Sequence, residues 1–479
     1  MTLDESRTRM ADLLHRQRSA FLHDGPPNLE LRRARLARLR TAVLAHREEL
    51  KDAVSADFGN RSRHETDLME LACVIQSIDY LSRNLRRFMK RERRHVEFSY
   101  RSARAYVEYQ PLGVVGVMAP WNYPLSLTLV PLATALAAGN RAILKPSEFT
   151  PCASEVMQRM LAEAFSEEEV AVVLGGPGVG AAFSALPFDH LLFTGSTQVG
   201  RKIMSAAGEN LVPVTLELGG KSPAIVARGH VNDRTMERVV YGKLSNAGQT
   251  CVAPDYALVH EEDVETFVSQ YAATVQRFYP DGLGSGDYTT IISDHHYQRL
   301  SGLVNDARSS GARVIEIGDR PLNMPGRERT MLPTLVINAG DDSSLMQEEI
   351  FGPVLPVRSY RSIDEAIAYV NARPRPLALY YFGNEDSDCT RLLERTTSGN
   401  VGINNTLMHV AQDDLPFGGV GPSGMGAYHG IEGFRTMSHA KGVFVQGRWS
   451  FPSMLHAPFG KLADMAISFT LGKNKTSSQ

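Results

Sequence analysis

The run Thr215-Leu-Glu-Leu-Gly-Gly-Lys-Ser-Pro223, followed by Asn246-Ala-Gly-Gln-Thr-Cys-Val-Ala-Pro254, organises this chain. In the first run a carboxylate, Glu217, stands just before a glycine pair that lets backbone or ligand come close. In the second run Cys251 follows a Gly-Gln-Thr turn, with small neighbours and no second cysteine nearby. The combination predicts a lone nucleophile with a base in reach.

The two side chains suit each other chemically. A thiolate is the strongest side-chain nucleophile near neutral pH, and in a loop or at a helix N-terminus the cysteine pKa can fall well below about 8.5. Cys251 would attack a carbonyl carbon, and water must then clear the covalent adduct. Glu217 could deprotonate that water if burial raised its pKa toward neutrality. Cysteine is also a common small core residue, so the presence of Cys251 alone does not indicate catalysis.

A phosphate-binding loop is a competing interpretation of Gly220-Lys221-Ser222. That loop requires a glycine five residues before Gly220, and the position holds Thr215. We therefore reject it.

Composition limits the possible functions. A chain of 479 residues predicts two or three structural units, and 43% hydrophobic with 22% charged residues is ordinary globular composition. A net charge of −2 gives no overall attraction to nucleic acid. The basic runs Arg32–Arg47 and Arg83–Arg94 interleave with leucine at helical spacing, so we expect them to be solvated helix faces.

The cysteines indicate the compartment. Cys73, Cys152, Cys251 and Cys389 are widely scattered, with no Cys-x-x-Cys pair and no histidine cluster at zinc spacing, which predicts free thiols and no metal. Residues 1–9 lack the apolar segment of a signal peptide, and the apolar stretch 114–138 is interrupted by three prolines. We expect a soluble, cytoplasmic protein without stable membrane insertion.

Hydrophobic periodicity predicts a helix from Leu29 to Val54, with Asn28 as N-cap, and a second helix over 65–91 with Leu68 among its inward residues. Residues 102–110 alternate and suggest an exposed strand that could extend a partner's sheet.

A strand over 111–118, a buried helix over 126–138 and a strand over 141–145 follow in the rhythm of a parallel crossover unit, as in a doubly wound nucleotide-binding sheet. A helix over 153–165 and a strand over 170–174 continue it. The glycines of 175–180 are wrongly spaced for a dinucleotide fingerprint. In 190–200 a strand turns through glycine into a helix that begins with Ser-Thr, where free N–H groups favour a pyrophosphate.

These runs resemble the aldehyde dehydrogenase superfamily. Leu216–Pro223 and Gly248–Pro254 are similar to its two active-site signatures, and further matching motifs follow the family's order at 119–124, 145–148, 190–200, 347–354, 399–405 and 415–426. The resemblance covers most of the chain. It implies an α/β fold with two doubly wound parallel-sheet domains and a small oligomerisation arm.

The resemblance also implies roles for residues. By this resemblance we expect Cys251 to be the nucleophile, Glu217 the general base, and Asn122 the oxyanion donor together with the backbone N–H of the nucleophile. The implied cofactor-binding residues are Trp121, Lys145, Glu148, Gly195, Ser196, Val199, Gly200, Leu218, Glu349 and Phe351. The resemblance favours NAD as the cofactor, because in the family a glutamate at this position usually repels the extra phosphate of NADP, and NADP stays open.

The expected organisation follows the family. An NAD-binding domain comprises 1–100 and 112–218, a catalytic domain 219–418, oligomerisation or bridging segments 101–111 and 419–447, and a tail 448–479 with a frayed polar end. The segment 462–471 is mildly amphipathic and too short and polar to span a bilayer. We expect a homodimer that takes a small-molecule aldehyde.

Two details resemble the class 3 branch: Val-Ala-Pro-Asp after Cys251, and the ending Gly-Ala-Tyr-His-Gly430. The loop 404–416 resembles that of bacterial coniferyl aldehyde dehydrogenases. We therefore expect oxidation of an aromatic aldehyde such as coniferyl aldehyde, or of a medium or long aliphatic one, to the acid through a thiohemiacetal and a thioester. The alternatives are an acylating, coenzyme A-dependent dehydrogenase and a non-catalytic NAD-binding structural protein.

Overall fold

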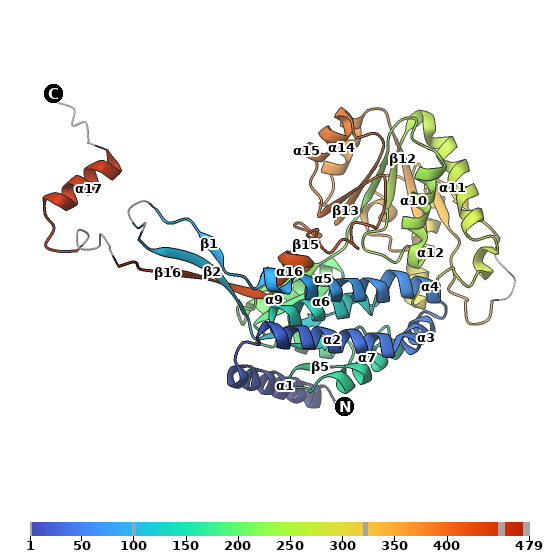
Figure 1. The fold of residues 1–479 in the computed structure, drawn as a ribbon. Helices are drawn as coiled ribbons and strands as arrows, with labels where there is room; N and C mark the ends of the chain where they lie inside the picture. The colour runs from blue at the N-terminus through green and yellow to red at the C-terminus, as the bar shows by residue number, and fades with distance from the viewer. Residues whose placement is uncertain (1, 98–99, 101, 320–323, 449–455, 473–479) are drawn as a thin grey trace, which may run out of the picture.

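The computed structural model describes residues 2–97, 100, 102–319, 324–448 and 456–472. These residues form a six-stranded, a seven-stranded and a three-stranded sheet. The two large sheets and their helices make the body, and the three-stranded sheet projects from it as a long arm (Figure 1). The expected α/β fold with two mostly parallel sheets is confirmed.

The six-stranded sheet has the order β15-β7-β6-β3-β4-β5, and only β15 is antiparallel to its neighbour. From β3 the chain runs outward to β4 and β5 on one side and later to β6 and β7 on the other. Ligands of such sheets bind outside the carboxyl ends of the strands, at this reversal. The strands are β3 (Val114–Met118), β4 (Arg141–Lys145), β5 (Val170–Val172), β6 (His190–Thr194), β7 (Val214–Glu217) and β15 (Gly424–Met425).

Helices cover this sheet, and its central strands are buried along their whole length. Burial on both faces explains why these strands are continuous apolar runs. The expected helices and strands between 111 and 208 are present with small shifts at their ends. The connecting helices are α6 (Ser126–Ala138), α7 (Pro151–Ala164), α8 (Pro177–Ser184) and α9 (Thr197–Gly208).

The N-terminal helices differ from the expectation. The single helix predicted from Leu29 is two, broken at His46, although Asn28 caps the first one as predicted. The second predicted helix contains a wide π-helical turn, which rotates Leu68 outward to 68% exposure, so its inward placement was wrong. The elements are α1 (Leu3–Asp24), α2 (Leu29–Ala45), α3 (Arg47–Phe58), α4 (Arg63–Thr66), η1 (Asp67–Leu71) and α5 (Ala72–Phe88).

The basic run beginning at Arg32 is not simply a solvated face. Arg32 and Arg35 are buried, and the Arg32 guanidinium donates to the carbonyls of Ala137 and Ala138 at 3.1 and 2.7 Å. These carbonyls end α6, where helical partners run out and the dipole favours a cation. Burial lowers the Arg32 pKa to about 10. Part of the basic run therefore ties α2 to α6.

The seven-stranded sheet has the order β10-β11-β12-β9-β8-β13-β14, with only β10 antiparallel to its neighbour. Its strands are β8 (Pro223–Val226), β9 (Tyr256–His260), β10 (Arg313–Glu316), β11 (Thr334–Ile337), β12 (Val354–Tyr360), β13 (Ala378–Phe382) and β14 (Asn400–Ile403). Its longer helices are α10 (Asp233–Leu244), α11 (Val264–Phe278), α12 (Asp294–Ser309), α14 (Ile363–Asn371) and α15 (Ser387–Arg395), with the short α13 (Ser344–Gln347).

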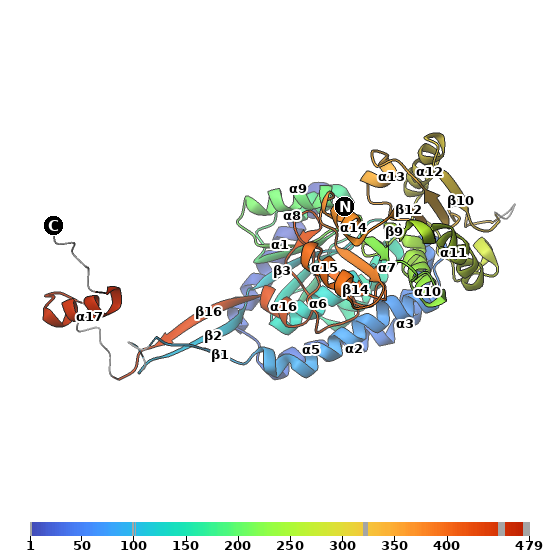
Figure 2. The same cartoon turned by 90° about the horizontal axis from the view of Figure 1, so that it is seen from above.

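The arm consists of β1 (Glu92–Arg94), β2 (Arg104–Pro111) and β16 (Ser438–Val445), with β2 in the centre. The strand expected over 102–110 is present as β2, but the expectation that it could extend a partner's sheet was wrong, because β16 pairs with all eight of its residues and β1 with three. Helix α16 (Gly430–Thr436) leads into β16, and α17 (Lys461–Leu471) lies beyond the arm (Figure 2). Residues 449–455 and the polar end 473–479 of the expected tail lie outside the described residues.

Candidate active site

The expected site residues of the six-stranded sheet meet at one edge. Asn122 follows β3, Lys145 ends β4, Ser196 follows β6 and Glu217 ends β7. Because these strands are parallel neighbours, their carboxyl ends lie side by side at the reversal of strand order. Side chains that are far apart in the sequence are therefore neighbours here.

Cys251 reaches this edge from the seven-stranded sheet. It precedes β9 and follows a turn in which Asn246, Ala247 and Gly248 have positive φ of 51°, 51° and 74°. A Cβ at Gly248 would lie 2.3 Å from the carbonyl oxygen of Gly352, so only glycine fits there. This left-handed turn fixes where the thiol emerges.

A buried ion pair holds the Asn122 loop beside that turn. The backbone carbonyl of Asn122 accepts from the Asn246 amide at 2.9 Å and from Arg61 at 3.0 Å. Arg61 also pairs with Glu70 at 3.0 Å, and Glu70 accepts from the backbone N–H of Leu125 at 2.7 Å. The Tyr123 and Thr250 hydroxyls add a 3.0 Å bond between loop and turn.

This arrangement does not use the side chain of Asn122. Asn122 is 3% exposed, and the hydrogen bonds that it makes within the described residues go through its backbone carbonyl. An amide donor on a loop fixed in this way is what a developing oxyanion requires.

Glu217 is a buried carboxyl group without partners. It is 2% exposed, and neither carboxyl oxygen has a hydrogen-bond partner among the described groups. Burial raises its pKa well above the usual value. A carboxyl whose pKa is raised toward neutrality can act as a general base.

Cys251 does not have the lowered pKa that a loop cysteine can show. Burial, together with the carboxylates of Glu349 and Glu217, raises the pKa of its thiol to about 12. The thiol is therefore protonated at neutral pH in this state, and a nearby acceptor must take its proton before it attacks. Both neighbouring carboxylates have raised pKa values, to about 8 for Glu349.

The N-terminus of α9 fits a pyrophosphate. Ser196 is its N-cap and accepts from the Val199 N–H at 3.4 Å, and Gly195 forms the turn before it. A Cβ at Gly200 would lie 2.7 Å from Leu218, so glycine lets α9 pack closely against the strand that carries Glu217. Unpaired N–H groups and the helix dipole favour an anion at such an end.

At the end of β4, buried Lys145 forms an ion pair with Glu148 at 3.0 Å. An ammonium and a carboxylate side by side supply donor and acceptor for a pair of sugar hydroxyls. Together with the α9 end, these residues fit a dinucleotide laid across the strand ends.

The far side of the site carries aromatic rings and an acid. Trp121 and Phe351 pack edge to face at 5.4 Å, and Phe351 is held at a φ of +55°. A Cβ at Gly219 would lie 2.2 Å from both carboxyl oxygens of Glu349, so the glycine makes room for this carboxylate. The structure thus brings Glu349 over the Gly219 turn, next to the cysteine.

Sequence reasoning missed the residues that hold Glu349. Lys221 forms a buried ion pair with Asp255 and donates to the carbonyls of Leu345 and Glu348, both at 2.9 Å. Asp255 in turn accepts from the Ile350 N–H at 2.9 Å. Lysine within a glycine-rich motif first suggests phosphate binding, so nothing in the sequence signalled this structural use.

Lys243 was missed as well. It is fully buried in α10, its ammonium has no hydrogen-bond partner in the described part of the chain, and burial lowers its pKa to about 8. A lysine in an amphipathic helix is ordinarily solvent-facing, so its sequence context gave no signal.

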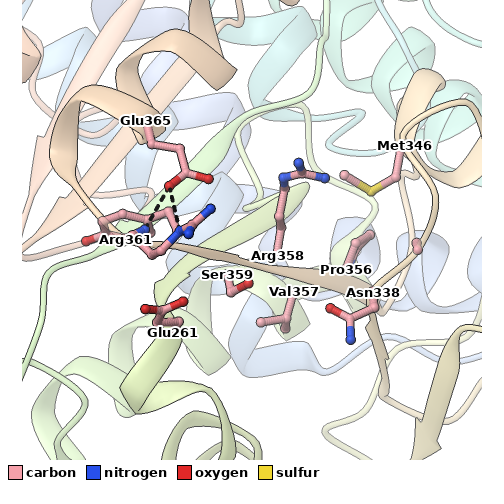
Figure 3. Close-up of a pocket in the computed structure, with 11 residues that line it drawn as sticks. Glu261, Asn338, Met346, Pro356, Val357, Arg358, Ser359, Arg361 and Glu365 are labelled. Carbon is pink, nitrogen blue, oxygen red and sulfur yellow. Dashed lines mark hydrogen bonds and ion pairs between the residues drawn. The ribbon is translucent and has the colours of Figure 1, made fainter.

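The open hollow in Figure 3 lies elsewhere. It has a volume of about 350 Å³ and is lined by residues from Glu261, just after β9, and from the end of β12. Cys251 precedes β9, so the hollow is at the opposite end of this sheet. Within the described ranges, no group of three or more His, Cys, Asp and Glu side chains could hold a metal, and no helix is long and apolar enough to cross a membrane.

Comparison with known proteins decides the family. The model described as "Aldehyde dehydrogenase family" matches residues 19–443. This chain belongs to the aldehyde dehydrogenase family. It is 48% identical over 465 residues to a coniferyl aldehyde dehydrogenase of a Pseudomonas species, covering 97% of this chain and 96% of the relative.

Other aldehyde dehydrogenases are also similar. Mouse aldehyde dehydrogenase family 3 member B2 is 37% identical over 462 residues, with 96% and 94% covered. A substrate-bound structure of Staphylococcus aureus AldH matches with a TM-score of 0.89 and 37% identity, covering 96% of this chain and 99% of that one. The expected similarity to class 3 and coniferyl aldehyde dehydrogenases is confirmed, and the chain is an NAD(P)-dependent aldehyde dehydrogenase.

Proposed function

We propose that this enzyme oxidises an aldehyde to the free acid, with Cys251 as nucleophile, Asn122 as oxyanion donor and Glu217 as general base. The observation that carries the proposal is the meeting of three groups at one strand edge: the Cys251 thiol, the amide of Asn122 on a loop held through its backbone carbonyl, and the buried carboxyl of Glu217, which has no partner among the described groups.

The proposed steps follow from these groups. A neighbouring carboxylate takes the thiol proton, and the Cys251 sulfur bonds to the aldehyde carbon. The Asn122 amide and the Cys251 backbone N–H hold the resulting oxyanion. Bound NAD supplies the acceptor for the hydride that leaves this carbon. Glu217 then takes a proton from water, which attacks the thioester and releases the acid, while the sulfur regains a proton.

For the cofactor, we propose NAD held by the ten residues expected from sequence, which run along the chain from Trp121 to Phe351. The Lys145–Glu148 pair, the α9 end and the Glu349 loop support this placement. A carboxylate at 148 opposes the additional phosphate of NADP by like-charge repulsion.

For the substrate, we propose aromatic aldehydes of the coniferyl type. The support is the 48% identity to the Pseudomonas coniferyl aldehyde dehydrogenase over nearly the whole chain. Medium or long aliphatic aldehydes are the second candidate class.

Two alternatives make different predictions. An acylating enzyme would pass the thioester to coenzyme A, whereas the buried carboxyl of Glu217 favours water. A non-catalytic binding protein on this scaffold would have lost a nucleophile, oxyanion donor or cofactor lysine, and all three are present here.

We further propose the domain division expected from the sequence, and a cytoplasmic homodimer. The free thiols support a reducing compartment. The projecting arm, whose outer strand β16 has one free edge in the described residues, and the exposed apolar side chains of α17 support contact with a second copy.

The test uses a matched cysteine pair. Cys251→Ala should abolish NADH formation with an aldehyde while NAD binding stays, and Cys73→Ala, another partly buried free cysteine, should keep full activity. Glu217→Gln should give one rapid equivalent of NADH and then slow turnover. Retained activity in Cys251→Ala refutes the nucleophile, and a steady state that depends on coenzyme A refutes hydrolysis.

A further inference from the structure

Two histidines and two aromatic residues form a cluster beside the proposed catalytic groups. The Phe417 ring stacks on His429 at 5.1 Å and lies 6.2 Å from His409. Tyr428 meets His429 edge to face at 4.5 Å. None of these four residues has a part in the reaction steps described above.

Three of the four imidazole nitrogens of this cluster are buried without a hydrogen-bond partner among the described residues. Both ring nitrogens of His409 and Nδ1 of His429 are buried and unpaired within the described part of the chain. His429 is 6% exposed. A buried polar atom left unpaired costs about 1–3 kcal/mol, so three such atoms together need an explanation.

The cluster lies next to the reacting groups. The charges of Glu217 and Cys251 both act on the Tyr428 hydroxyl, and a Cβ at Gly418, adjacent to Phe417, would lie 3.2 Å from Glu217 Oε1. Tyr380 packs against His409 at 5.8 Å and donates to the carbonyl of Val252, the neighbour of Cys251, at 2.6 Å. A substrate bonded to Cys251 would therefore have this cluster within reach of its side chain.

We propose that His409 and His429 bind a phenolic hydroxyl on the ring of an aromatic aldehyde, with Phe417 and Tyr428 contacting the ring. The proposal rests on the proposed function and adds the feature by which the enzyme distinguishes hydroxylated from unsubstituted aromatic aldehydes.

The chemistry of the cluster suits a neutral hydroxyl. Burial lowers the pKa of both histidines to about 4, so both imidazoles are neutral at pH 7. A neutral imidazole offers one donor and one acceptor, and a phenol likewise donates and accepts. Aromatic rings favour edge-to-face or offset contacts with another ring. An aliphatic chain would leave the nitrogens unpaired.

The test compares cinnamaldehyde with 4-hydroxycinnamaldehyde, which differ only in the hydroxyl. kcat/KM is measured for both with wild type, His409→Phe and His429→Phe, which keep a ring and remove the polar nitrogens. His260→Phe is the matched control, because His260 is also buried against an aromatic ring, that of Tyr360, but lies at the far end of β9. Calorimetric NAD binding reports whether each variant is folded.

The expected wild-type preference for the hydroxylated aldehyde is about 10-fold or more, and each variant should reduce it about 3- to 10-fold, as loss of one hydrogen bond does. The unsubstituted aldehyde should change less than about twofold. His409→Asn, which retains hydrogen-bonding groups, should recover part of the preference and supports the proposal if His409→Phe does not fold.

Three results would overturn the inference. The first is a wild-type kcat/KM ratio between the two aldehydes near one. The others are an equal loss of kcat/KM with both aldehydes in the variants, and an unchanged preference for the hydroxylated aldehyde in both His409→Phe and His429→Phe. In each of these the enzyme still oxidises aldehydes, so the proposed function stands. No NADH from either aldehyde with wild type would instead refute the proposed aromatic substrate class, and this inference with it.

Discussion

Gly219→Ala should impair cofactor binding selectively. A Cβ there would lie 2.2 Å from both Glu349 carboxyl oxygens, where ordinary contacts begin above about 3 Å. The carboxylate must therefore retreat by about 1 Å. A displacement of that size in a positioned group can lower the activity that depends on this group by up to about 100-fold. We expect NAD affinity to fall about 10- to 100-fold, with the KM for aldehyde little changed.

The assay is calorimetric titration of NAD, followed by steady-state KM values for NAD and aldehyde. Gly302→Ala in α12 is the matched control, because nothing lies within 4 Å of a Cβ at that position. The control should bind NAD as wild type does. Wild-type NAD affinity in Gly219→Ala, in a folded protein, would show that the Glu349 carboxylate is not needed over the Gly219 turn.

Three further predictions concern charge. Because the pKa of buried Glu217 is raised on folding, its favourable effect on stability is complete below about pH 4.5 and is lost as pH rises through the folded pKa. The melting temperature of Glu217→Gln should therefore rise relative to that of wild type between acidic and neutral pH. A difference in melting temperature that stays constant with pH would contradict this. Glu349→Gln removes a carboxylate that raises the Cys251 thiol pKa, so iodoacetamide should label Cys251 at lower pH than in wild type, and an unchanged pH profile would contradict it. Arg61→Met leaves buried Glu70 unpaired and should lower the free energy of unfolding, measured in urea, by about 3–5 kcal/mol. The double variant Arg61→Met, Glu70→Gln should recover much of this loss. A loss under about 1 kcal/mol in Arg61→Met would refute a structural role for the pair.

The parallel core was predictable because its signals are local. The apolar runs that became β3, β4 and β6 can be buried on both faces only in such a sheet, and Ser196 marks a helix start. Helix α1 was missed, although Thr2 and Glu5 form a capping box and Met10, Leu13 and Leu14 follow at helical spacing. The π-helical turn left no trace in the spacing of hydrophobic residues.

The site shows a similar division. Cys251 and Glu217 stand out through their motifs, but their pKa values depend on burial and on Glu349, which is distant in sequence. The pairs Arg61–Glu70 and Lys221–Asp255 are formed by tertiary structure. The Tyr-His pair at 428–429 was visible only as a mark of the family branch, and its position beside the catalytic groups required the fold.

The central claim is that the Cys251 sulfur bonds to the aldehyde carbon while Glu217 serves the later water step. Glu217→Gln incubated with NAD and cinnamaldehyde, quenched in acid and digested, tests it by peptide mass spectrometry. The account predicts a cinnamoyl group on the Cys251 peptide, in an amount equal to the NADH formed. The same acyl group on Cys73, Cys152 or Cys389, with Cys251 unmodified, would contradict it.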